Sequence, residues 1–99
     1  MIRWTRSARI EPAKFMEAMQ WAKEIAEFIS KKHGVQTTVY LDSFGEYGTV
    51  RWFADHADLA TLEKFGRQIF TDQEYLQRLN QAPGLIVPGS VFDTVMRSL

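Results

Sequence analysis

The stretch from Val35 to Ala54, VQTTVYLDSFGEYGTVRWFA, constrains the fold most, because it has the pattern of two strands joined by a turn. Both of its ends are rich in β-branched and aromatic side chains, which suit a pleated, half-buried surface. Between them lie turn-favouring residues, Asp42, Ser43, Gly45 and Gly48. The stretch therefore predicts a β-hairpin with a turn longer than two residues.

The segment before the hairpin predicts a strand followed by a helix. Residues 2–10 alternate apolar and polar side chains, as a half-buried strand does, although Arg6 falls on the apolar parity. From Phe15 to Ile29, apolar residues recur at three- and four-residue steps, with Pro12 before them and Gly34 after them. A proline suits the first turn of a helix and a glycine suits the position after its end, so both ends are marked.

Two aromatic residues, Trp21 and Phe28, lie off the apolar stripe of this predicted helix. Two interpretations are open: neighbouring side chains partly cover them, or they form a subunit contact. His33 lies at the helix end, where a cation is favourable, and is predicted to cap the helix or to be solvated.

The segment after the hairpin predicts a second helix in two pieces and a last strand. Asp55 or Asp58 is placed to cap the helix, and Gly66 weakens its pattern. A capping-box pattern at Thr71 indicates a new helical start. Residues 90–98 have apolar side chains on both parities and predict the last strand.

The predicted order is βαββαβ, which is the ferredoxin-like α+β plan: a four-stranded antiparallel sheet with helices on one face. The 99 residues fit a single domain spanning 1–99. In a monomer, the other face of such a sheet meets water and is polar. Tyr40, Phe53 and one parity of the last strand would make it partly apolar. We therefore expect a second copy to cover that face in a homodimer.

Composition excludes several classes of protein. Twelve basic and twelve acidic residues give a formal net charge of zero, so we expect no nucleic-acid partner and no attraction to a membrane surface. No apolar run approaches the roughly 20 residues that cross a bilayer, and the first residues lack the apolar core of a signal peptide, so we expect a soluble, cytoplasmic protein. The chain has no cysteine and only two histidines, without further clustered ligands, so no metal and no cofactor is predicted.

Parity in the strands divides the sheet into two faces. The predicted helix-facing residues are Ile2, Trp4, Val39, Leu41, Val50 and Trp52, and the predicted residues of the opposite face are Arg3, Thr5, Arg9, Thr38, Tyr40, Arg51 and Phe53. Among the latter, Arg9, Tyr40 and Arg51 are candidate ligand-binding residues. A guanidinium group can bind a carboxylate or phenolate with two hydrogen bonds and also stacks on flat rings.

There are alternatives for each of these candidates. The arginines could instead pair with carboxylates such as Asp42 or Asp93 across an interface, or extend into solvent. His56 is a fourth candidate ligand-binding residue, flanked by Asp55 and Asp58, but its position near a helix start offers a simpler explanation.

The chain resembles the dimeric α+β barrel superfamily, and within it the small NIPSNAP-like proteins. The residues that carry the resemblance are the strand-to-helix entry Ala8-Arg9-Ile10-Glu11-Pro12, the segment from Phe44-Gly45 to Arg51-Trp52, the helix start Leu59-Ala60, the segment Thr71-Asp72-Gln73-Glu74-Tyr75, and Val87-Pro88-Gly89-Ser90 before the last strand. The resemblance implies two ferredoxin-like subunits that press their sheets together around an interior cavity. Branches of the superfamily include cofactor-independent monooxygenases, haem-degrading enzymes, dehydratases and proteins of no known activity, so the resemblance does not select an activity.

Three functional hypotheses follow. The first is a homodimer that binds a small aromatic or acidic organic molecule in the barrel interior. The second is a cofactor-independent monooxygenase or isomerase, in which Tyr40 and an arginine polarise the substrate. The third is a non-catalytic subunit or regulatory module that associates through the sheet face. Whether the protein is an enzyme is left open by the sequence.

Overall fold

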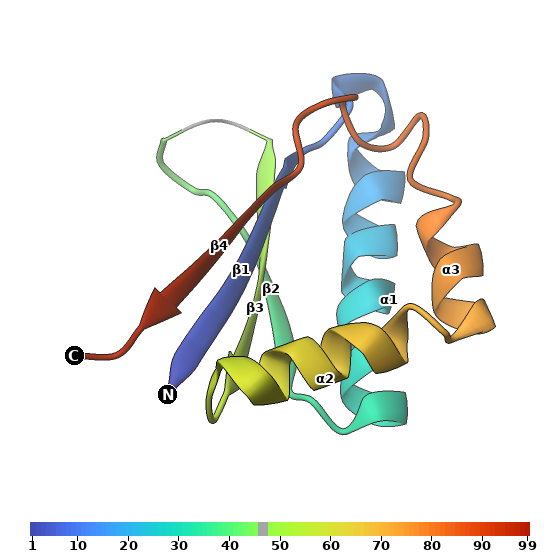
Figure 1. Ribbon diagram of the computed structural model, residues 1–99. Helices are drawn as coiled ribbons and strands as arrows, with labels where there is room; N and C mark the ends of the chain where they lie inside the picture. The colour runs from blue at the N-terminus through green and yellow to red at the C-terminus, as the bar shows by residue number, and fades with distance from the viewer. Residues whose placement is uncertain (46–47) are drawn as a thin grey trace.

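A computed structural model describes residues 1–45 and 48–99 and shows a four-stranded antiparallel sheet with three α-helices on one face (Figure 1). The strands are β1 (Ile2–Arg9), β2 (Thr37–Leu41), β3 (Thr49–His56) and β4 (Phe92–Arg97), in the spatial order β2-β3-β1-β4. This arrangement confirms the predicted ferredoxin-like α+β fold. The middle of the predicted turn, residues 46–47, lies outside the described residues.

The strand register confirms the two predicted faces of the sheet. Trp4 of β1 lies opposite Ala54 of β3, and Val39 of β2 lies opposite Trp52 of β3. Trp52 is buried, and its indole N–H donates to the backbone oxygen of Ala22 at 3.0 Å. The helices therefore pack on the predicted apolar parity, and the opposite parity forms an open face.

Helix α1 (Phe15–His33) follows a short 3₁₀ turn (Pro12–Lys14). Its predicted apolar stripe is buried against the sheet, and Gly34 ends it in the left-handed conformation with φ 68°. Positive φ has no steric penalty at glycine, which is why this residue suits the position.

The second helical region forms two helices, α2 (Leu59–Ile69) and α3 (Gln73–Leu79). Asp58 caps α2, accepting a 2.8 Å hydrogen bond from the backbone N–H of Thr61. The cap of α3 is Asp72 rather than the predicted Thr71. The Thr71 hydroxyl instead donates to the backbone oxygen of Gln68, at the end of α2, at 2.7 Å. It is therefore not available to cap α3.

Helix α3 covers the two aromatic residues that lie off the stripe of α1. Trp21 is 7% exposed, and its indole N–H donates to the Arg78 backbone oxygen at 2.8 Å. Phe28 is 8% exposed, and its ring stacks with the ring of Tyr75 at 6.4 Å between the two centroids. Lys32 Nζ also lies 5.4 Å from the centroid of the Phe28 ring, which agrees with the predicted cover by a neighbouring side chain, but α3 makes the cover nearly complete and leaves little of either residue exposed for a subunit contact. Helix α1 buries two faces, one against the sheet and one against α3 (Figure 1).

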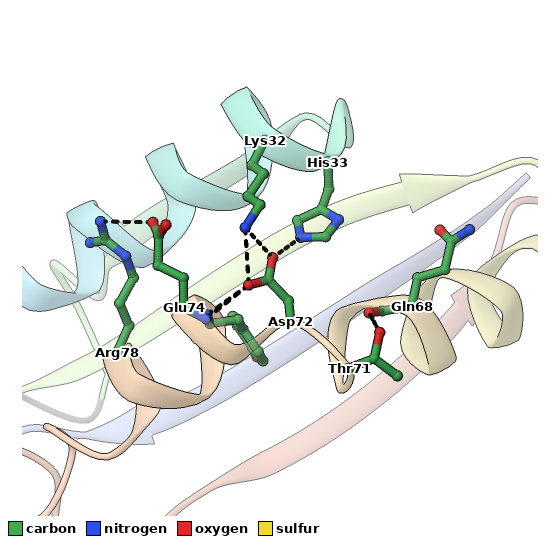
Figure 2. A network of polar contacts seen from close by, with 8 residues as sticks. Lys32, His33, Gln68, Thr71, Asp72, Glu74 and Arg78 are labelled. Carbon is green, nitrogen blue, oxygen red and sulfur yellow. Dashed lines mark hydrogen bonds and ion pairs between the residues drawn. The ribbon is translucent and has the colours of Figure 1, made fainter.

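A polar network joins the end of α1 to the start of α3 (Figure 2). The Asp72 carboxylate contacts Lys32 Nζ at 3.0 Å and His33 Nε2 at 2.8 Å, and it also accepts from two backbone N–H groups of α3. His33 thus contacts a carboxylate 39 residues away instead of capping its own helix or being solvated. Burial alone would raise the pKa of Asp72, but the hydrogen bonds from Lys32, His33 and the backbone of Tyr75 together outweigh it and lower that pKa to about 2.

Strand β4 forms one edge of the sheet, and all six of its residues are exposed. Before it, Ile86 packs into the core, and the backbone N–H of Val87 donates to the backbone oxygen of Arg9 at 2.9 Å, so the connection between α3 and β4 is held against the rest of the chain. After β4, the backbone N–H of Ser98 donates to the backbone oxygen of Met1 at 3.0 Å, so the two ends of the described chain lie close together.

Candidate functional site

The open sheet face carries a band of aromatic and arginine side chains across β2, β3 and β1. Tyr40 and Arg51 lie directly opposite each other on β2 and β3. The Tyr40 and Phe53 rings meet edge to face at 5.6 Å, and the Arg3 guanidinium lies over Phe53 at 5.8 Å from its centroid. The structure therefore brings together two of the predicted ligand-binding residues, Tyr40 and Arg51.

The arginines of this band are paired with carboxylates of the same chain. Arg51 binds Asp42 with two hydrogen bonds of 2.9 and 3.0 Å, and Arg3 binds Asp55 with two of 2.8 and 3.0 Å. The hydrogen bond from Arg51 lowers the pKa of Asp42, and the one from Arg3 lowers that of Asp55. An acidic ligand would have to compete with these carboxylates for the arginines. The sequence left open that the arginines pair with carboxylates across an interface, and here the pairs form within one chain.

These side chains line a hollow of about 630 Å³ on the open face. Its lining consists of Arg3, Gln36, Thr38, Tyr40, Asp42, Arg51, Phe53, Ala54 and Asp55. The other two predicted ligand-binding residues lie elsewhere. Arg9 is at the far end of β1, opposite Thr49, and His56 is on the helix face of β3. The four predicted residues therefore do not form one site.

A second pocket, of about 230 Å³, lies between the helix face of the sheet and α2. We call it the α2 pocket. It is lined by Trp4, Arg6, Ile29, Thr37, Ala54, His56, Leu62, Phe65, Gly66, Ile69, Phe70, Tyr75 and Asp93. Phe70 is 58% exposed, which places it at the mouth.

His56 brings a buried polar atom to this pocket that has no partner among the described residues. Its side chain is 6% exposed, and its Nε2 atom has no hydrogen-bond partner among the described residues. The imidazole ring lies 5.5 Å from the ring of Phe65. Burial lowers the pKa of His56, and the charge of neighbouring Asp55 offsets this only in part, so the ring is neutral at pH 7. A buried, unsatisfied nitrogen is costly and is a position where a ligand group gains a hydrogen bond.

An ion pair forms another part of the pocket lining. Arg6 binds Asp93 with two hydrogen bonds of 2.7 and 2.9 Å, and the Trp4 indole N–H reaches Asp93 at 3.4 Å. The hydrogen bond from Arg6 lowers the pKa of the Asp93 carboxyl. Both charges are therefore neutralised locally, and the remaining lining is chiefly aromatic and aliphatic.

Sequence reasoning missed most of this second pocket. The usable signal was Arg6, which interrupts the apolar parity of the first strand and so had to point toward the helices. Asp93 lies directly opposite it on β4. A charged residue on a buried parity needs a partner of opposite charge, and strand pairing supplies one.

Within residues 1–45 and 48–99, no three carboxylate or imidazole side chains are grouped so that they could hold a metal ion. None of the helices in these two ranges is both long and apolar enough to cross a membrane.

No family model and no curated protein sequence matches the chain. Solved structures do match its fold over essentially its whole length. A NIPSNAP domain protein from Burkholderia xenovorans has a TM-score of 0.84 at 11% identity, covering 100% of this chain and 95% of its own. A NIPSNAP family protein from Agrobacterium tumefaciens has a TM-score of 0.78 at 18% identity, covering 99% and 85%. A structure described as an antibiotic biosynthesis monooxygenase has a TM-score of 0.74 at 11% identity, covering 100% and 99%. The chain thus has the ferredoxin-like fold of NIPSNAP-domain proteins and of antibiotic biosynthesis monooxygenases.

Proposed function

We propose that this protein binds a small, neutral, largely apolar organic molecule in the α2 pocket. The observation that carries the proposal is the buried His56 Nε2 atom, which has no partner among the described residues and belongs to the lining of a 230 Å³ pocket. Ligand pockets combine apolar walls with a few polar groups that fix orientation, and this pocket has that composition.

The charges around the pocket favour a neutral ligand. His56 is neutral at pH 7 because burial lowers its pKa. The Arg6 guanidinium already donates to Asp93 through its Nε and Nη2 atoms. A carboxylate ligand would lose its hydration without gaining an unpaired cation. Of the two ligand classes that the sequence suggests, the aromatic one therefore fits this pocket and the acidic one does not.

Toluene tests this proposal, because it matches the pocket in polarity and is small enough to enter. We expect toluene to shift the backbone amide resonances of Phe65, Gly66 and Ile69 in a saturable way. The amides of Tyr40 and Asp42, which line the open-face hollow and are not adjacent to any residue of the α2 pocket, serve as the internal control and should not move. Shifts confined to the open face, or none up to the solubility of toluene, would show that the α2 pocket does not bind such molecules.

We also propose that a second copy of the chain covers the open face. Support comes from its apolar side chains: Tyr40 is 62% exposed, Phe92 73% and Met96 43%. Large apolar side chains that are exposed on a sheet face favour an interaction surface there. In such a dimer, the hollow beside Tyr40 and Arg51 would lie between two sheets, and ligand binding there stays a prediction. Light scattering should give a mass of twice 11.5 kDa, and a mass of 11.5 kDa at every concentration would exclude the dimer.

A further inference from the structure

The α2 pocket lies where α2 lacks a side chain. Leu62, Phe65, Gly66 and Ile69 all line the pocket and recur at helical spacing, so they share the inward stripe of the helix. A Cβ atom built on Gly66 would meet nothing within 4 Å. A well-packed helix face fills such space with a side chain, because interiors are close-packed. Gly66 thus leaves the room that a ligand can take.

The volume of the pocket limits its ligand to about one ring. An engineered cavity of about 150 Å³ holds benzene, and drug-sized ligands occupy about 300 Å³ or more. The 230 Å³ here lies between the two. The walls include the rings of Phe65 and Tyr75, which suit an aromatic molecule by stacked or edge-to-face contacts.

The unpartnered nitrogen of His56 selects the polar group of such a ligand. A neutral imidazole carries one proton, so Nε2 either accepts or donates, depending on the tautomer. A hydroxyl group can do both, and it therefore fits either tautomer. A carboxylate cannot donate, and a methyl group can do neither.

Resting on the proposed function, we propose that the α2 pocket selects single-ring aromatic molecules that carry a neutral hydroxyl group. His56 binds the hydroxyl, and Gly66 leaves space for the ring. This assigns His56 and Gly66 as the residues that determine specificity.

Calorimetric titrations with phenol, toluene and benzoate test this selection. The readout is the ratio of the phenol and toluene affinities, since the ratio cancels effects on the pocket as a whole. We expect His56→Leu to lower that ratio by about fivefold, as one hydrogen bond to a buried group is worth about 1 kcal/mol. His56→Gln, which keeps a donor and an acceptor, should retain most of the ratio, and benzoate should bind most weakly.

A direct measurement guards against misfolding of the variants. In the unaltered protein, phenol should shift the ¹⁵N resonance of His56 Nε2 strongly, and toluene should not. Gly66→Leu should abolish binding of both molecules, whereas Arg67→Leu, which places a leucine at the next, exposed position of the helix, should leave both affinities unchanged.

The outcomes separate the two proposals. If toluene binds in the pocket but the affinity ratio is the same in His56→Leu, the selection by His56 is wrong and the proposed function stands. If Gly66→Leu binds both molecules normally, Gly66 does not set the available space. If neither phenol nor toluene binds the unaltered protein, the proposed function fails, and this inference fails with it.

Discussion

Two buried side chains, Asp72 and His56, differ in how completely their polar atoms are hydrogen-bonded. The Asp72 carboxylate accepts from Lys32, from two backbone N–H groups and from His33, depending on its tautomer (Figure 2). The Nε2 atom of His56 has no such partner among the described residues. Satisfied buried groups stabilise a fold, whereas an unsatisfied one lowers stability unless a ligand completes it. At the level of single residues, the first is therefore structural and the second is a candidate for function.

We predict that Asp72→Asn lowers stability at neutral pH and weakens the acid dependence of stability. The pKa of Asp72 is about 2 in the folded protein, below its ordinary value of 3.8. The unfolded chain therefore binds more protons between these values, so the contribution of Asp72 is present above about pH 4 and is lost as the pH falls toward about 2. Urea unfolding should show a large difference between the two proteins at about pH 7 and a smaller one at about pH 2.5.

Glu63→Gln is the matched control for this prediction, because it also removes one carboxylate charge, from an exposed position on α2. Its unfolding midpoint should stay close to that of the unaltered protein at both pH values. An equal loss of stability in Asp72→Asn at both pH values would contradict the assigned role of the ionised carboxylate.

Sequence patterns could predict which face of a strand each residue occupies, but not these long-range contacts. Alternation placed Tyr40 and Arg51 on one face correctly, since parity is a local property of strands. The contact between His33 and Asp72 joins residues 39 positions apart and depends on where α3 docks. No local periodicity encodes that docking.

Among the helices, α2 combines an amphipathic pattern with a glycine in its interior. Glycine in a helix lowers stability by about 0.5–1 kcal/mol relative to alanine, because the unfolded chain has more freedom to lose. The sequence showed Gly66 only as a weakness in the pattern. In the structure, Gly66 lies on the inward stripe of α2, and its missing side chain leaves space in the α2 pocket.

We predict that Gly66→Ala raises the free energy of unfolding by about 0.5–1 kcal/mol. The backbone of Gly66 is helical, and the added methyl group meets no atom within 4 Å. Gly34→Ala provides the opposite control, because Gly34 has φ 68° and an alanine there is strained. Urea denaturation measures both variants. A loss of stability in Gly66→Ala would mean that the space beside this residue is not available to a side chain.

The same separation of local and tertiary information holds for α1. Its ends and its sheet-facing stripe follow from the spacing of apolar residues and from Gly34. The burial of Trp21 and Phe28 does not, because their cover comes from α3, more than forty positions along the chain. A helix that packs against both a sheet and a second helix has apolar residues on two faces. From the sequence alone, the second apolar face cannot be told from an exposed apolar patch.

For the whole molecule, the sheet separates two surfaces with different chemistry. The helix face holds the core and the α2 pocket, and the open face holds paired charges beside exposed rings. One-sided cover of this kind leaves a polar open face in a stable monomer. Phe92 and Met96 on β4 do not fit that expectation, since both lie on the open face and are exposed.

We predict that Phe92→Lys shifts the protein from dimer to monomer. Phe92 is 73% exposed in the single chain, so the substitution should not unfold it, but an interface would have to bury the new charge. Met16→Lys is the matched control, because Met16 on α1 is 72% exposed and lies away from the sheet. Light scattering should give a single-chain mass for Phe92→Lys and twice that mass for Met16→Lys. If Met16→Lys dissociates the dimer and Phe92→Lys does not, the copies associate through the helical layer, and the apolar open face needs another partner.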